Sequence, residues 1–523
     1  MNDENPPIAH RKWLDNGICV DEPLYTCPND KGKIPGHLNM VRYYAGQLIK
    51  ELPASLRGAW LYWVEAAALW HDLGKFSLEF QKYIKDKQIS PHSTETVELN
   101  GGKKVDHSTA GAKHASTYWG TSKASYGDML AYIIAGHHAG LPNGPDLFFE
   151  RFHKKIPDWE SYAPADLYSF TEPSPPRLWH EKSHTPDRNL GFAVAMQIRM
   201  LFSFLTDSDF LGTEHFMCQE KRDMRPSWPQ NILAQMSLRL EAHLGNMESA
   251  RNLTPIQRLR REIHHQCLSR AQVPQGIYQL NVPTGGGKTL SSLSFALAHA
   301  QHCHMSRVIY VIPFTSIIDQ TAKTFREIMA PLDEKFGMEC VLEHHSNLAA
   351  DKDTERVRLM SENWDAPLIV TTSVQFFESL FSNKPSVCRK LHNITNSVII
   401  FDEAQNLPSH LLAPCLEAMK TLEKDYGCTL VLCTATQPTL EHKKEFPIGW
   451  PAGELTSLLG NDFERRLENA MQRVTIQHLG RMDQNALIRH WNTLPDQSAL
   501  FIVNTTREAQ FLFDAFSSQS ASH

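Results

Sequence analysis

The chain has 523 residues, of which 41% are hydrophobic and 21% charged, with a formal net charge of -6 and a pI near 6.5. This length is too great for one ordinary hydrophobic core and predicts two or three domains. The acidic balance gives no general attraction to nucleic acid, so any nucleic-acid binding would need a local basic groove. The ten cysteines form no CxxC pair, which argues against a zinc ribbon and a disulfide framework and favours reduced thiols.

The sequence contains no run of about 18 apolar residues. The first residues, Met1-Asn-Asp-Glu-Asn-Pro-Pro, also lack the basic and apolar regions of a signal peptide. We therefore expect a cytoplasmic protein without a membrane partner.

The spacing of apolar residues divides the chain into two parts. In the first part they recur at helical spacing, as in Trp60–Trp70 and Leu190–Phe204. From about residue 276, short β-branched runs alternate with helical segments, which is typical of a parallel sheet buried on both faces. The chain is therefore predicted to be multidomain: a mostly α-helical domain over 1–225, a linker over 226–250, an α/β parallel-sheet domain over 251–485, and the start of a further domain over 486–523. The candidate strands are 277–282, 308–312, 368–371, 398–402, 429–433 and 500–503.

Histidine and aspartate recur along the helical part in a pattern that suits a metal site. His71 and Asp72 are adjacent, and on a helix their side chains would point about 100° apart, so each could bind a different ion of a close pair. Each histidine alone is better explained as a packed or solvated residue. Their joint occurrence favours ligands, because a buried imidazole without a partner is costly. The candidate metal ligands are His37, His71, Asp72, His107, His137, His138 and Asp207.

We expect two divalent ions with Asp72 as the bridging carboxylate. Two such ions could stabilise the attacking and departing oxygens of a phosphodiester displacement. Imidazole-rich ligation favours a transition metal such as Mn, Ni, Co or Fe over magnesium. Lys75, one turn beyond Asp72, is a candidate to bind a substrate phosphate or steady the ligands, and Asp209 could cap or orient. The expected sets are His37, His71, Asp72 and Asp207 for one ion, and Asp72, His107, His137 and His138 for the other.

The string Trp70-His-Asp-Leu-Gly-Lys-Phe-Ser-Leu-Glu-Phe-Gln81 resembles the central motif of the HD phosphohydrolase superfamily. His107-Ser-Thr-Ala-Gly111 and Gly136-His-His-Ala-Gly140 resemble its later motifs. The closer resemblance is to the HD nuclease part of the CRISPR-associated helicase-nuclease of type I interference systems. This resemblance implies a metal-dependent nuclease that acts on single-stranded DNA.

A glycine-rich loop, Pro283-Thr-Gly-Gly-Gly-Lys-Thr289, lies between a predicted strand and a predicted helix, as a phosphate-binding loop requires. Val282 takes the place of the first glycine of the full pattern, and this shorter form resembles helicases of superfamily 2. Lys288 would neutralise phosphate oxygens, and Thr289 would hold Mg²⁺. The residues predicted to bind ATP and its magnesium are Gln257, Thr284, Gly285, Gly286, Gly287, Lys288, Thr289 and Asp402.

Val398-Ile-Ile-Phe-Asp-Glu-Ala-Gln405 resembles a helicase DEAD/DEAH box with Gln405 in the last place. Asp402 would hold Mg²⁺, and Glu403 would position the attacking water. Thr434-Ala-Thr436 resembles the motif that couples the ATP state to strand binding. Pro313-Phe-Thr-Ser316 and Thr371-Thr372 end strands where such motors touch the nucleic-acid backbone, although each is as well explained as a strand-end turn.

Leu500-Phe-Ile-Val503 looks like the opening strand of a second RecA-like domain, whose remainder, with its arginine finger, is missing. We therefore expect weak ATP hydrolysis and no translocation by this chain alone, and a complementing C-terminal helicase polypeptide as a candidate partner. The resemblance implies that the intact protein is recruited by a Cascade-like guide-RNA surveillance complex, moves 3′ to 5′ on single-stranded DNA using ATP, and cuts it. Two alternatives stay open: an HD-superfamily nucleotide phosphohydrolase with a regulatory ATP domain, and a non-catalytic truncated binding module.

Overall fold

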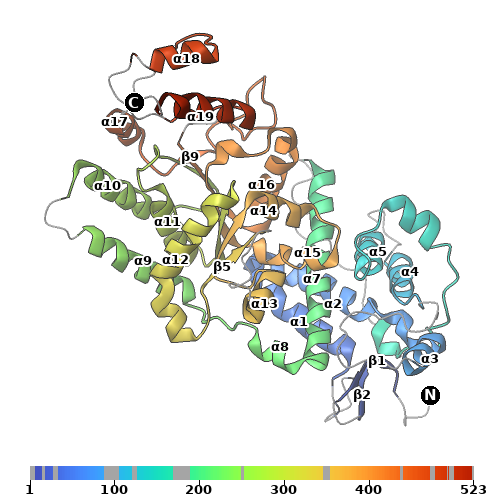
Figure 1. Ribbon diagram of the computed structural model, residues 1–523. Coiled ribbons are helices and arrows are strands. Elements are labelled where there is room, and N and C mark those ends of the chain that lie inside the picture. Colours follow the sequence, from blue (N-terminus) through green and yellow to red (C-terminus); the bar gives the residue numbers. More distant parts are fainter. Residues whose placement is uncertain are drawn as a thin grey trace. The chain divides into compact units, whose positions relative to one another are not determined.

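The structure is a computed structural model, and it forms two compact units, 1–467 and 468–523 (Figure 1). Each unit is described by itself. The structure describes residues 6–14, 18–27, 33, 35–86, 105–119, 126–168, 189–248, 253–345, 354–435, 440–471, 477–491, 493 and 500–520.

The first part of unit 1 is helical, as predicted (Figure 1). A short antiparallel hairpin of β1 (Ile8–Trp13) and β2 (Cys19–Pro23), which the sequence pattern did not predict, precedes the helices. The helices are α1 (His37–Leu48), α2 (Ala54–Trp70), α3 (Leu78–Asp86), α4 (Ser108–Tyr118), α5 (Tyr126–Gly136), α7 (Leu190–Met217) and α8 (Gln219–Met224), with the short turns η1 (Ile49–Glu51), η2 (Leu73–Phe76), η3 (Asp146–Arg151) and η4 (Ala165–Tyr168).

Helix α7 is the central element of this part. By length and composition alone it could cross a bilayer, but 56% of its most apolar window is buried inside the protein, as in the core helix of a folded domain. It contacts α1, α2 and α5 on the helical side, and α15 (Pro385–Cys388) and α16 (Leu412–Tyr426) on the sheet side. Such burial on several sides explains why its sequence is apolar over most of its length.

The second part of unit 1 is built on a seven-stranded sheet in the order β5-β6-β4-β7-β8-β3-β9, with every pairing parallel. Strands β4, β6, β7 and β8 are buried along their whole length, which is the environment that their β-branched runs predicted. The strands are β3 (Ile277–Asn281), β4 (Arg307–Ile312), β5 (Val341–His344), β6 (Leu368–Thr372), β7 (Ser397–Phe401), β8 (Thr429–Thr434) and β9 (Thr456–Ser457).

Helices cover both sides of this sheet. In Figure 1, α11 and α12 lie on one side, and α14 and α16 lie on the side next to α7. The predicted fold class, a helical domain followed by an α/β parallel-sheet domain, is confirmed. The remaining helices of unit 1 are α10 (Pro255–Ser269), α11 (Lys288–His302), α12 (Thr315–Phe336), α13 (Glu355–Asn363), α14 (Ser373–Phe381) and α17 (Asn461–Met471), which extends past the unit boundary, with short turns η6 (Leu391–Ile394), η7 (Ala404–Asn406) and η8 (Ser409–Leu411).

The segment 226–250, predicted to be a linker, instead contains helix α9 (Ile232–Glu248). Its apolar residues Leu233, Met236 and Leu240 are buried, and the helix packs against α11 and α12. This spacing is that of an amphipathic helix, and the nearby Pro226 and Pro229 only mark its start. The prediction of a linker is therefore wrong.

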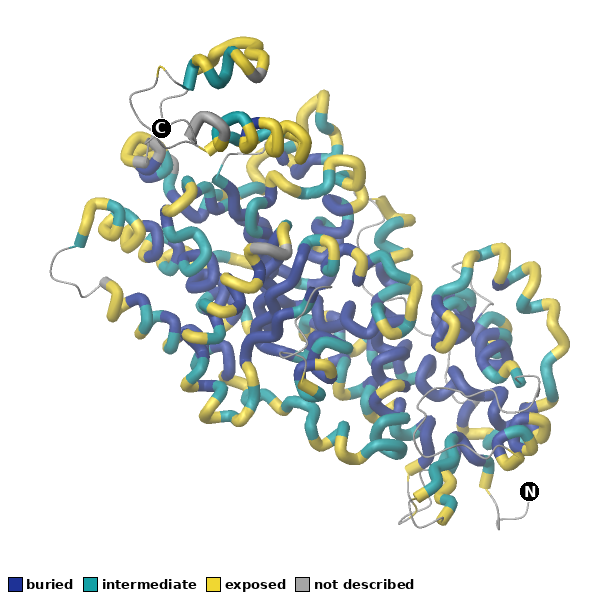
Figure 2. The backbone as a smooth tube through the Cα atoms, in the orientation of Figure 1, coloured by how far each residue is buried: buried dark blue, intermediate teal, exposed yellow. Residues whose placement is uncertain are grey.

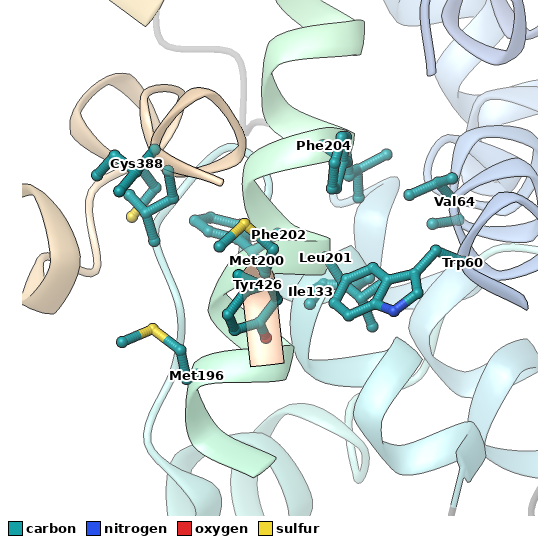
Figure 3. Close-up of a cluster of buried hydrophobic side chains, with 14 of the residues drawn as sticks. Trp60, Val64, Ile133, Met196, Met200, Leu201, Phe202, Phe204, Cys388 and Tyr426 are labelled. Carbon is teal, nitrogen blue, oxygen red and sulfur yellow. The ribbon is translucent and has the colours of Figure 1, made fainter. Parts of the chain in front are cut away.

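The helical part and the sheet part share one hydrophobic core. Figure 2 shows buried backbone running from the sheet through α7 into the helices, and Figure 3 shows the side chains where the two parts meet. The two parts therefore belong to the same compact unit. The labelled residues of this meeting point are Trp60 and Val64 of α2, Ile133 of α5, Met196, Met200, Leu201, Phe202 and Phe204 of α7, Cys388 of α15 and Tyr426 of α16.

Unit 2, over its described residues, contains α18 (Gln484–Trp491) and α19 (Thr506–Ser520). The strand predicted over 500–503 is not formed, and Leu500 and Ile502 are 84% and 87% exposed. A strand needs a neighbour to complete its backbone hydrogen bonds, and the described residues of this unit offer none.

Candidate metal and nucleotide sites

Four buried side chains from separate elements converge on one point in the helical part. His37 is the first residue of α1, His71 and Asp72 directly follow α2, and Asp209 lies in α7. His37 Nε2 lies 3.2 Å from Asp209 Oδ1, and His71 Nε2 lies 3.2 Å from Asp72 Oδ2. His71 Nε2 is also 3.6 Å from Asp209 Oδ1. The four groups can therefore surround one cation.

A second group adjoins the first through the other oxygen of Asp72. His107 Nε2 and His137 Nε2 lie 3.4 Å and 3.5 Å from Asp72 Oδ1, and His138 Nε2 lies 2.9 Å from His107 Nε2. The ligand atoms of these four residues lie within 4.8 Å of one another. Because Oδ2 faces one group and Oδ1 the other, Asp72 has the geometry of a bridging carboxylate.

The rings of His71 and His137 are held through Nδ1, so that Nε2 faces the cluster. His71 Nδ1 and His137 Nδ1 lie 2.8 Å and 2.7 Å from the carbonyls of Ala68 and Ile134, to which each can donate its proton. Among the described residues, no hydrogen-bond partner reaches His71 Nε2, His137 Nε2, either ring nitrogen of His37, or Asp72 Oδ1, although all are buried. Buried polar atoms without partners are costly, so these residues fit a bound metal.

Burial and charge set the protonation of the cluster. Burial lowers the pKa of His107 to about 4, against the opposing effect of Asp72, and burial together with His137 holds the pKa of His138 well below its usual range. Burial alone would raise the pKa of Asp72, but His71 and Lys75 outweigh it and keep the group ionised. In the metal-free site, burial opposes the charged form of His71, yet Asp72 and Asp209 raise its pKa to about 10. Metal binding would therefore displace a proton from His71.

The prediction that Asp207 is a metal ligand is corrected by the structure. Asp207 Oδ1 lies 2.7 Å from Arg389 Nε, and its Oδ2 accepts a 3.0 Å hydrogen bond from Asn363. Asp209 is the residue that reaches the histidines. Two residues along a helix correspond to a rotation of about 200°, so Asp207 and Asp209 face opposite sides of α7.

Two polar residues beside the cluster come from places that the sequence pattern did not single out. Glu22 of β2 is 2% exposed, and its carboxylate lies 2.6 Å from His10 Nδ1 and 3.8 Å from His37 Nδ1. The hairpin that carries Glu22 and His10 was not predicted, so neither residue could be placed near His37 from sequence.

The glycine-rich loop leads into the amino end of α11. Gly285 and Gly287 both have φ of +84°, and Gly287 precedes the helix without any side-chain cap. The first N–H groups of α11 therefore remain available to an anion such as phosphate. Arg260 Nε donates a 2.8 Å hydrogen bond to Gly285 O and so braces the loop. Thr284 is exposed and Gly286 buried within the same turn.

Lys288 is held by the two acidic residues that follow β7. Its Nζ lies 3.2 Å from Asp402 Oδ1 and also contacts Glu403 Oε1. Tyr310 OH lies 3.3 Å from Asp402 Oδ2. Burial would lower the pKa of Lys288, but Asp402 and Glu403 raise it above its ordinary value. The structure thus brings together Lys288, Asp402 and Glu403 as predicted from sequence, with Thr289 next to Lys288 at the start of α11.

The other predicted motor residues are placed as follows. Gln257 is exposed, and its Oε1 accepts hydrogen bonds from Thr254 in a capping box at the start of α10. Thr371 donates to the carbonyl of His344, and Thr372 caps α14. Thr434 Oγ1 donates to Asn281 at 2.9 Å, whereas Thr436 lies outside the described residues. Contacts of these residues with adenine or nucleic acid stay predictions.

Fold and sites together define a class of protein: a helical domain with a two-centre histidine and aspartate cluster, joined to a parallel-sheet domain with a phosphate-binding loop. Residues 37–186 match the family model described as "Cas3, HD domain", and residues 257–444 match that described as "DEAD/DEAH box helicase". The helical part is thus similar to the HD domain of Cas3 and the sheet part to DEAD/DEAH box helicases, which confirms the resemblance found from the motifs.

Three similar proteins illustrate the extent of the match. "CRISPR-associated nuclease/helicase Cas3" of Haloferax volcanii is 23% identical, over 93% of this chain and 58% of that protein. The crystal structure of T. fusca Cas3-ADP is 17% identical with a TM-score of 0.49, over 82% of this chain and 51% of that one. A "CRISPR RNA-guided surveillance complex, pre-nicking" contains a chain that is 18% identical with a TM-score of 0.43, over 83% and 48%. The chain thus spans about half the length of these relatives.

Proposed function

We propose that the helical domain is a metal-dependent nuclease for single-stranded DNA and that the sheet domain is part of an ATP-dependent 3′ to 5′ helicase in CRISPR type I interference. The observation that supports this proposal most is Asp72, whose two carboxylate oxygens face two groups of candidate ligands. The similarity to the Haloferax volcanii protein, which is named as a CRISPR-associated nuclease/helicase, supports the choice of a nuclease over a nucleotide phosphohydrolase.

Two divalent transition-metal ions, of Mn, Ni, Co or Fe, fit the ligands present. When bound, such a pair supplies a water acidified toward neutral pH and stabilises the charge that develops on the phosphodiester. The neutral imidazoles of His107 and His138 and the ionised Asp72 and Asp209 are already in the forms that metals bind. The proposed sets are His37, His71, Asp72 and Asp209 for one ion, and Asp72, His107, His137 and His138 for the other.

Lys75 is proposed to hold Asp72 rather than to bind a substrate phosphate. Its Nζ lies 2.7 Å from Asp72 Oδ2, and the residue is 4% exposed. A lysine buried in this way has little access to a polymer. Its charge offsets that of the carboxylate and fixes the direction of Oδ2 toward the first ligand group.

In the sheet domain we propose that ATP and Mg²⁺ bind at the amino end of α11. The Lys288 ammonium would exchange its contacts with Asp402 and Glu403 for phosphate oxygens, which would release Asp402 to hold Mg²⁺ and Glu403 to orient water. We infer that Gln257 contacts the adenine. A Cascade-like surveillance complex is proposed as the recruiting partner, supported by the similarity to CRISPR-associated relatives, and the cytoplasm is proposed as the compartment.

Unit 2 is proposed to be the start of the second helicase lobe. The exposed Leu500 and Ile502 lie in an extended segment without a strand partner among the described residues of this unit. Further polypeptide that paired with this segment would cover both side chains.

The nuclease proposal is tested by incubating the purified chain with circular single-stranded DNA and Mn²⁺, without ATP. Cutting that disappears with EDTA, His71→Ala and Asp72→Ala is expected. Glu51→Gln serves as the control and should still cut, because the Glu51 carboxylate pairs with Arg307 and belongs to neither ligand group. A folded, metal-loaded chain that leaves DNA intact would contradict the proposal. Hydrolysis of free nucleotides by that chain would then support a phosphohydrolase, and inactivity on both substrates a binding module.

A further inference from the structure

Helix α7 carries two functions on opposite faces. One face presents Asp209 to His37 and His71, and on the next turn Gly212 lies against Val41 of α1 so closely that an added Cβ would be 3.0 Å from Val41 Cγ2. The other face makes directional polar contacts with the helicase domain. Asp209, a proposed metal ligand, thus lies on a helix whose opposite face contacts the helicase domain.

The contacts on the second face recur at helical spacing. Arg199 donates to the carbonyl of Ser382, and Ser203 Oγ lies 3.0 Å from His392 Nδ1 while accepting a 3.1 Å hydrogen bond from the His392 backbone N–H. One turn further, Asp207 binds Arg389. The spacing of four residues keeps Arg199, Ser203 and Asp207 on one stripe of the helix.

The centre of this stripe is a fully buried ion pair. The side chains of Asp207 and Arg389 are 0% and 4% exposed, with 2.7 Å between Oδ1 and Nε. Asn363 donates to the second oxygen of Asp207, and Arg389 lies 4.5 Å from the ring centre of Phe210 and 3.0 Å from Glu362. A buried ion pair adds little net stability over apolar packing, but its hydrogen bonds are directional.

Directional contacts matter here because most of the side chains packed around this stretch of α7 are apolar. The methionine, leucine and phenylalanine side chains that α7 itself carries (Figure 3) make apolar contacts without a fixed direction, whereas metal ligands tolerate displacements of only about 0.2 Å. An ion pair with directional hydrogen bonds on one face opposes rotation of α7 about its own axis. Such a rotation would also move Asp209, on the opposite face, relative to the two histidines.

We propose that Asp207 and Arg389 are positioning residues for the nuclease: the helicase domain, through this pair, holds Asp209 in the geometry that binds the first metal ion. The inference rests on the metal site of the proposed function and adds the control of that site by the adjoining domain. Arg389 lies between α15 and η6, which leads directly into β7 and the Asp402-Glu403 pair.

The test measures Mn²⁺ binding, not cleavage, in Asp207→Asn and Arg389→Lys. Asp207→Asn keeps the size of the side chain and removes its charge, and Arg389→Lys keeps the charge and removes the fixed direction of Nε. Both are expected to bind one of two ions about 10- to 100-fold more weakly, the usual effect of losing an outer partner of a ligand, while the ion beside His107, His137 and His138 keeps its affinity.

The matched control is Glu51→Gln. Glu51 also pairs with a helicase-domain arginine, Arg307, at 2.8 Å, but it lies in η1, which follows the end of α1 that is remote from the ligand His37. This variant should bind both ions as the wild type does. Variants of Asp207 and Arg389 that bind both ions normally, that lose both ions together, or that do not fold would overturn the proposal. A folded wild-type chain that binds no Mn²⁺ would instead overturn the metal site itself.

Discussion

Gly74→Ala is expected to push the candidate metal ligands Asp72 and His107 apart, although neither residue is itself substituted. Gly74 is the second residue of η2, the short turn that directly follows Asp72. It packs against the backbone of His107 and donates a 3.2 Å hydrogen bond to the His107 carbonyl. A Cβ at Gly74 would lie 2.4 Å from the His107 carbonyl oxygen and 2.6 Å from its Cα. Both contacts are with backbone, so neither can be relieved by rotating a side chain.

The size of the effect follows from these distances. Ordinary van der Waals contact begins near 3.4 Å, so η2 and His107 must move apart by about 1 Å, several times the roughly 0.2 Å that metal coordination tolerates. The ion shared by Asp72 and His107 should bind at least tenfold more weakly, while the ion beside His37, His71 and Asp209 is retained. The strain should also lower the free energy of unfolding by about 1–3 kcal/mol.

Titration with Mn²⁺, followed by the EPR signal of the free ion, measures both affinities. Gly58→Ala in α2 is the matched control, because no atom lies within 4 Å of its added Cβ. That variant should bind both ions normally and gain about 0.5–1 kcal/mol of stability. A folded Gly74→Ala protein that binds two ions with wild-type affinity would refute the placement of His107 beside Asp72.

Three further outcomes are expected. Lys288→Ala should weaken binding of a fluorescent ATP analogue at least tenfold, since it removes the cation that meets the phosphates; unchanged affinity would argue against a nucleotide site at α11. Burial, reinforced by Arg389, lowers the pKa of Lys390 to about 8. Between about pH 8 and pH 10.4, Lys390 is therefore protonated in the unfolded chain but largely neutral in the folded one, so the free energy of unfolding should rise with pH over this range. Lys390→Met should therefore raise the free energy of unfolding at pH 7 by roughly 2 kcal/mol, measured as a higher unfolding temperature, and this gain should be smaller at pH 10.5. A gain that is the same at both pH values would contradict the low pKa. Finally, Mn²⁺ at a hundred times its dissociation constant should stabilise the wild type by about 2.7 kcal/mol, and calorimetry of Asp72→Asn should show little of this increase.

The class of fold could be predicted because burial on both faces leaves a direct mark on the sequence. β4, β6, β7 and β8 appear as continuous apolar runs, and each was predicted within one or two residues. β5 and β9 have only four and two residues, too few to show a pattern. The strand expected over 500–503 has a suitable sequence but no neighbour among the described residues of its unit, and the sequence of a segment does not reveal whether it has a pairing partner.

Within the metal site, the types and order of the residues could be used to predict ligands, but the sequence does not reveal the direction in which each side chain points. The ligands that stand at the ends of helices, such as His71, His107 and His137, came together as expected. Asp207 and Asp209 both lie within α7, and only the packing of that helix decides which of them faces the histidines. His71 and Asp72 also follow the end of α2 rather than lying within it, so the expected 100° rotation between them does not apply.

The most direct test of the account is anomalous diffraction from crystals grown with Mn²⁺. We expect two peaks, one beside His37, His71 and Asp209 and the other beside His107, His137 and His138, with Asp72 between them and Asp207 still bound to Arg389. A single peak, or a peak coordinated by Asp207, would contradict the proposed two-metal centre.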